Sequence, residues 1–71
     1  MTFQEATDRL LQAGLTLSEV AAAISYESQT VRAIRSGARK PPPPEKWKPQ
    51  LVALARARID ALQGFVTDAE E

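Results

Sequence analysis

The chain has 71 residues, with nine basic and nine acidic side chains and neither cysteine nor histidine. This length fits one domain, and the missing thiols and imidazoles exclude disulfides, the common zinc sites and imidazole-dependent triads. With no signal-like start, no apolar run of ~20 residues and only scattered carboxylates, we expect a cytoplasmic protein without a membrane segment, metal, cofactor or enzymatic activity.

The first predicted helix begins after Thr2. Thr2 and Glu5 have the spacing of a capping box, in which each residue satisfies a backbone N–H of the other. Apolar residues then recur at helical intervals as far as Ala13, and Gly14 is suited to end the helix. This pattern predicts a helix over residues 3–13.

Two short helices are predicted next. Thr16 and Glu19 form a second capping box for a helix that reaches residue 24, and Ser25 ends it. Another helix is predicted over residues 28–36, closed by Gly37. The apolar spacing lets the two helices cross and share a small core that contains Val20, Ile24, Tyr26, Val31 and Ile34. The outer face of the second is polar, with side chains able to reach base edges and phosphates in a DNA major groove.

The charges are segregated along the chain. Residues 32–58 carry eight basic side chains against one acidic side chain, Glu45, which gives +7, and the remaining residues sum to −7. The cationic stretch begins on the helix predicted over 28–36 and continues through the next loop. We therefore expect a basic face that suits a polyanion.

Residues 38–48 form a basic connection, in which four consecutive prolines favour an extended polyproline II spacer. Trp47 is expected to anchor the final helix in the core. The C-terminal helical segment is assigned to residues 49–66, with Gly64 as a helix stop, and residues 67–71 are expected to be a frayed acidic tail. The whole chain, 1–71, is predicted to be a single all-α domain with its DNA-binding helices within 2–37.

Residues 16–41 resemble the lambda-repressor-like (Cro/XRE-type) helix-turn-helix of small phage-type regulators. The resemblance rests on Thr16, Glu19, Val20, Ala21, Ile24, Ser25, Tyr26, Thr30, Val31, Ile34, Gly37, Arg39 and Pro41. It implies a compact bundle of four to five helices whose second motif helix lies in the major groove. It also implies a sequence-specific transcriptional regulator, a repressor or autorepressor that binds a palindromic operator.

The resemblance assigns DNA contacts position by position. The base-contacting set is Glu27, Ser28, Gln29, Arg32 and Ala33. The phosphate-contacting set is Thr16, Ser18, Arg35, Arg39 and Lys40.

Two positions depart from the family pattern. Ser25 stands where the family favours glycine, so a positive φ there would cost ~1 kcal/mol. Glu27 replaces a usual capping residue, and Ser28 is the alternative cap.

A homodimer is expected, because one recognition helix contacts too few base pairs for specific occupancy. The final helix has more apolar surface than one small core needs. We assign Leu51, Leu54 and Ala55 to the core, and the dimer interface to Ile59, Leu62, Phe65 and Val66. The alternative is an antitoxin-like protein-interaction module that neutralises a partner protein through this helix.

Overall fold

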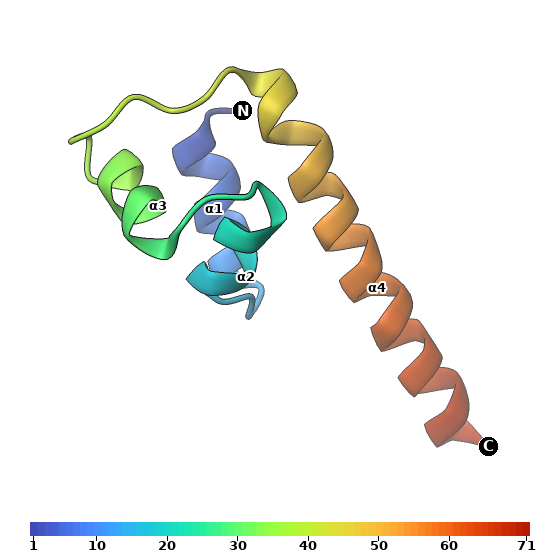
Figure 1. The fold of residues 1–71 in the computed structure, drawn as a ribbon. Helices are drawn as coiled ribbons and strands as arrows, with labels where there is room; N and C mark the ends of the chain where they lie inside the picture. The colour runs from blue at the N-terminus through green and yellow to red at the C-terminus, as the bar shows by residue number, and fades with distance from the viewer.

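The computed structural model describes all 71 residues and contains only helices and loops: α1 (Phe3–Gln12), α2 (Leu17–Ala23), α3 (Ser28–Arg35), the short 3₁₀ helix η1 (Pro44–Lys46) and α4 (Lys48–Glu70). This arrangement confirms the all-α fold with a proline-containing connection to a C-terminal helix. Helices α1–α3 form a small three-helix body, and α4 runs along it and continues well past it (Figure 1). The molecule therefore measures 49 × 20 × 20 Å.

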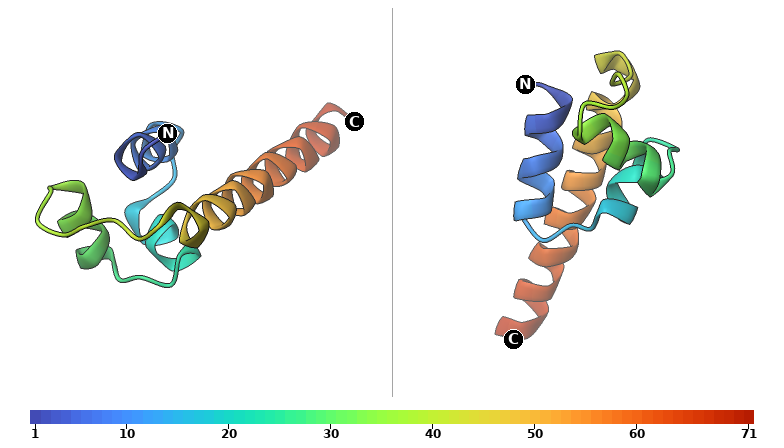
Figure 2. Two further views of the ribbon diagram at one scale, coloured as in Figure 1. Left: turned by 90° about the horizontal axis from the view of Figure 1, so that it is seen from above. Right: turned by 90° about the vertical axis from the view of Figure 1, so that its left-hand side faces the viewer.

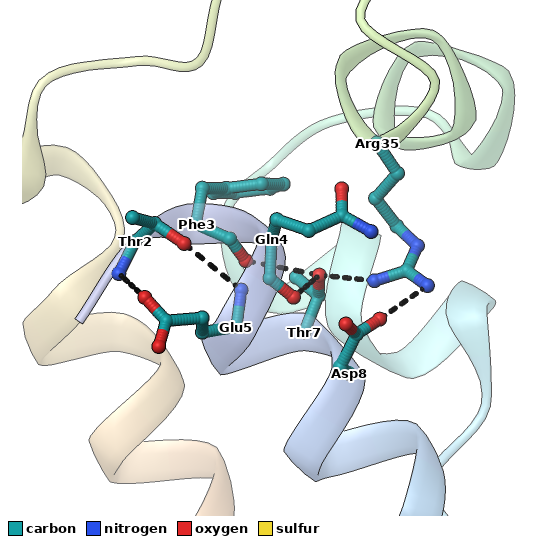
Figure 3. A network of polar contacts seen from close by, with 7 residues as sticks. All are labelled: Thr2, Phe3, Gln4, Glu5, Thr7, Asp8 and Arg35. Atoms are coloured by element: carbon teal, nitrogen blue, oxygen red, sulfur yellow. Dashed lines mark hydrogen bonds and ion pairs between the residues drawn. The ribbon is translucent and has the colours of Figure 1, made fainter.

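Both predicted capping boxes are present. The Thr2 hydroxyl accepts from the Glu5 N–H at 3.1 Å, and the Glu5 carboxylate accepts from the Thr2 N–H at 3.0 Å (Figure 3). The same pair of bonds joins Thr16 and Glu19, at 3.1 and 3.2 Å. Each box satisfies two backbone donors that a helix N-terminus would otherwise leave without partners.

The turn between α2 and α3 is built around Ser25, which has a φ of +61°. This non-glycine residue therefore bears the cost of a positive φ, about 1 kcal/mol. The next N–H, that of Tyr26, donates to the Ala21 carbonyl at 2.8 Å and directs the chain back across α2. Glu27 is the N-cap residue of α3 but makes no side-chain capping bond, and Ser28 is already helical. The alternative in which Ser28 caps the helix is thus wrong.

The core lies where α1, α2 and α3 meet the first turn of α4. Val20 and Val31 are completely buried, and Ala21 provides the small side chain where α2 and α3 approach each other. The other buried members of this cluster are Phe3, Ala6, Ile24, Ile34, Trp47 and Leu51. Figure 2 shows the three short helices gathered around the N-terminal half of α4, while its C-terminal half projects away from them.

Trp47 attaches α4 to the body, as expected. Its side chain is buried, and its ring meets the Phe3 ring edge-on with 5.5 Å between centroids. The connection that leads to it is extended, with Pro43 at φ −61° and ψ 150°, before η1 turns the chain into α4. Leu51 follows one turn later and is also buried, so the first turn of α4 is held on its inner side.

The end of α4 differs from the sequence-based expectation. The helix continues through Gly64 and ends at Glu70, so the predicted stop at Gly64 and the predicted frayed tail at 67–71 are both wrong. A glycine inside a helix costs roughly 1 kcal/mol relative to alanine, which weakens a helix without ending it. No proline follows Gly64, and Gly64 lacks the positive φ found at Gly14 and Gly37.

No helix of the molecule, α4 included, combines the length and the apolar character that crossing a membrane requires.

Candidate nucleic-acid interface

Helix α3 has one buried face and one free polar face. Val31 and Ile34 are buried against α2 and α1, whereas Gln29 and Arg32 are exposed and form no side-chain hydrogen bond or ion pair. Ala33 lies half-buried beside them. Because residues three and four apart share a helix face, Gln29, Arg32 and Ala33 form one continuous outer surface.

The two edges of this outer surface are formed by different neighbours. On one edge, the half-buried Ser28 places its hydroxyl 3.4 Å from the hydroxyl of Ser18, in the first turn of α2. On the other edge, Thr30 lines a shallow polar hollow with Glu27 and Arg39. Since each helical residue advances the direction by about 100°, Ser28 and Thr30 lie on opposite sides of Gln29. The predicted base-contacting residues are thereby brought together on one surface, with Ser18 and Arg39 beside it.

Arg35 points away from this surface. Its guanidinium pairs with the Asp8 carboxylate at 2.7 Å and donates to the hydroxyl of the buried Thr7 (Figure 3). The Thr7 hydroxyl in turn donates to the Phe3 carbonyl at 2.9 Å. Arg35 therefore ties α3 to α1, and its charge is offset within the molecule. The sequence does not show this pairing, because Asp8 lies 27 positions earlier.

Thr16 is also occupied by contacts within the chain. Its hydroxyl accepts from the Glu19 N–H and lies 3.1 Å from the Glu19 carboxylate. The carboxylate also pairs with Arg58 of α4, so one residue joins the start of α2 to α4. The backbone hydrogen bond from Thr16 lowers the pKa of Glu19, and Arg58 contributes to the same shift. Arg58 is a structural contact that sequence patterns did not indicate.

Several cations remain available to an external anion. Arg32, Arg39, Lys40, Lys46 and Arg56 are exposed and form no ion pair, whereas two of the eight basic residues between 32 and 58 are paired internally. Lys48 lies over the Trp47 ring at 5.7 Å, with its charge at the surface. Glu27 is the one acidic side chain among the predicted contacts, and it has no ion-pair partner. A polyanion approaching α3 would thus meet Arg32, Arg39 and Lys40 on or directly after the helix.

The residues expected at a dimer interface are exposed in the single chain. The exposed fractions are 53% for Ile59, 57% for Leu62, 68% for Phe65 and 48% for Val66. They belong to the half of α4 that extends past the three-helix body (Figure 1). By contrast, Leu51 is buried and Leu54 and Ala55 are half-buried, as expected for the residues assigned to the core.

Comparison with protein-family models, with curated proteins and with solved structures found no match to this chain.

Proposed function

We propose that this protein binds double-stranded DNA sequence-specifically and inserts α3 into the major groove. The observation that carries the proposal is the division of α3 into a buried face and an uncommitted polar face. Val31 and Ile34 hold the helix in the core, while the side chains of Gln29 and Arg32 are exposed and form no hydrogen bond or ion pair. A short helix held in this way can present its outer side chains to base edges.

The side chains on the outer face have complementary chemistry in the major groove. Gln29 can pair with N6 and N7 of adenine, and Arg32 can pair with O6 and N7 of guanine. Ala33 offers a methyl group to the methyl of thymine, and Ser28 can donate to or accept from a base edge. Glu27 can accept from N4 of cytosine, which would offset its repulsion of nearby phosphates.

Phosphate binding is assigned to a narrower set than the sequence suggested. Ser18 lies beside Ser28 at the edge of the outer surface of α3, and Arg39 and Lys40, in the loop after the helix, form no ion pair. We leave Arg35 and Thr16 out of this set because their side chains hold α1 and α2 in place. Most hydrogen bonds in protein–DNA interfaces go to phosphates, and they fix the position of the reading helix.

A regulator of this kind acts as a homodimer, because two α3 helices read two half-sites of a palindrome about 34–36 Å apart. Occupancy of such an operator suits repression, including repression of the protein's own promoter. The second candidate is an antitoxin-like module that binds another protein. The exposed apolar side chains of α4, such as Leu62, favour it, whereas selective binding of a duplex by the purified chain favours the regulator.

The test is selection of duplexes from a random pool, followed by titration of the preferred duplex at several salt concentrations. Gln29→Ala and Arg32→Ala should each cost ~1–3 kcal/mol and relax the preference at particular base pairs. Lys40→Ala should weaken all duplexes alike and reduce the salt slope by about one. Arg56→Ala is the matched control, because Arg56 is also an exposed cation but lies on α4.

The proposal fails if selection returns no preferred sequence. It also fails if Gln29→Ala and Arg32→Ala bind every duplex as the unmodified protein does. If both variants lose affinity uniformly but keep the base preference, α3 is not the reading element and the assigned residues are wrong.

A further inference from the structure

One face of α4 carries an apolar stripe with the spacing of a coiled-coil seam. Its residues alternate steps of three and four positions: Val52, Ala55, Ile59, Leu62, Val66 and Ala69. This is the a/d pattern that lets two helices pack along a continuous line. We call these six residues the α4 seam. Val52 is 49% exposed and Leu62 is 57% exposed, so the chain leaves the seam uncovered except at the half-buried Ala55.

The seam begins in an apolar groove between α1 and α4. The groove is lined by Met1, Ala6 and Leu10 on one side and by Trp47, Leu51, Val52 and Ala55 on the other. Arg9 and Lys48 also line it and add positive charge. Val52 and Ala55 belong to both the groove and the seam. The groove and the projecting half of α4 therefore form one connected apolar surface, and a second helix laid on the seam would also enter the groove.

The charges along α4 select the direction of that second helix. Its first half carries Lys48 and Arg56, which form no ion pair, and its end carries Asp68, Glu70 and Glu71. Arg58 is already paired with Glu19 of α2. A parallel pair would place like charges side by side, whereas an antiparallel pair places the acidic end of each helix beside the basic start of the other. The helix dipoles also oppose each other favourably only in the antiparallel arrangement. Charge complementarity therefore points to a second copy of this chain.

We infer that two copies pair antiparallel along the α4 seam, each placing the end of α4 in the partner's groove. The register that pairs a with d positions brings Ile59 opposite the partner's Leu62, and Ala55 opposite the partner's Val66. The same register sets Val52 opposite the partner's Ala69, so a small side chain meets a larger one at each outer layer. Glu70 and Glu71 then lie within one turn of the partner's Lys48. This pairing supplies the second copy that the proposed function needs, but it depends on no DNA contact.

Self-association is tested first, by sedimentation equilibrium without DNA. The unmodified chain should be a dimer, and Leu62→Glu should be a monomer whose buried Trp47 keeps its native fluorescence. Ala57→Glu is the matched control, since it adds the same charge to α4 on the side opposite the seam, and it should remain a dimer. A monomeric unmodified chain at concentrations up to about 1 mM overturns the inference, as does a Leu62→Glu protein that stays dimeric. If Leu62→Glu loses its native fluorescence, Ile59→Gln takes its place in the same test.

The antiparallel direction of the two α4 helices is tested by disulfide cross-linking. The chain has no cysteine of its own, so only the introduced cysteines can form a disulfide. Ala55→Cys and Val66→Cys proteins are mixed in equal amounts, oxidised and weighed by mass spectrometry. Antiparallel pairing gives mainly the mixed product, in which position 55 of one copy is joined to position 66 of the other. A parallel dimer gives mainly the two unmixed products, and that result overturns the inference. A normal antiparallel dimer that prefers no DNA sequence would refute the proposed function alone.

Discussion

Replacing Ser25 with glycine should stabilise the protein. Ser25 has a φ of +61°, a region that costs a residue with a Cβ roughly 1–2 kcal/mol, whereas glycine adopts it freely. The Ser25 side chain is exposed and makes no hydrogen bond, so its removal sacrifices no contact. The backbone bond from its N–H to the Ala22 carbonyl, at 3.1 Å, is retained.

Part of this gain is offset in the unfolded chain, where glycine has more freedom to lose, by about 0.4–1 kcal/mol. The net increase in the free energy of unfolding should be ~0.5–1 kcal/mol. For a domain of this size, that corresponds to a rise in Tm of about 2–8 °C. Thermal and urea unfolding, followed by far-UV circular dichroism, would measure both quantities.

Ser36→Gly is the matched control, because it makes the same chemical change at the end of α3. Ser36 has a φ of −82° and its hydroxyl donates to the Ala33 carbonyl at 3.0 Å, so glycine should lower the free energy of unfolding there. If Ser25→Gly is no more stable than the unmodified protein while Ser36→Gly is destabilised as expected, the left-handed turn is not the conformation in solution.

Two further predictions concern the attachment of α4 and the response to acid. Trp47→Ala should lower the free energy of unfolding by ~3–5 kcal/mol, because it removes the ring that packs between Phe3 and α4. Urea titration would measure this loss, and Trp47→Phe, which keeps an aromatic ring, should lose clearly less. The pKa of Glu19 is below the ordinary 4.5, mainly because its carboxylate accepts a hydrogen bond from the Thr16 N–H. The ionised Glu19 therefore stabilises the fold above pH 4.5, and this stabilisation is lost as the pH falls through the lowered pKa. Glu19→Gln should be less stable at pH 7 and should lose less stability on acidification, whereas an unchanged acid response would contradict this assignment.

Several features of the fold that depend on one residue or on residues close together in the sequence were predicted correctly. The two capping boxes follow from residues three positions apart, and the burial of Trp47 follows from its large apolar side chain; the structure confirms both. The predicted stop at Gly64 was wrong because glycine by itself does not end a helix. Helices end at a glycine when it adopts a positive φ or when a proline follows, and Gly64 has neither.

The candidate site was predictable only in part, for a related reason. The polar outer face of α3 follows from helical spacing alone, and the structure shows Gln29 and Arg32 exposed there. Which cations remain free depends on contacts between distant residues. Arg35 pairs with Asp8, and Arg58 pairs with Glu19 of another helix, so charge counted along the sequence overstated the charge available to an anion. The use of the α3 surface for DNA stays a prediction.

The extended connection before η1 also affects how α4 reaches its place. Four consecutive prolines have restricted φ in the unfolded chain as well as in the folded one, so ordering them sacrifices little backbone entropy. A short, stiff segment also keeps Trp47 within a limited range of positions, which raises its local concentration near Phe3 before the contact forms. The three-helix body, which buries few side chains, thus holds the long helix α4 at a low entropic cost, because the proline segment already restricts where α4 can lie.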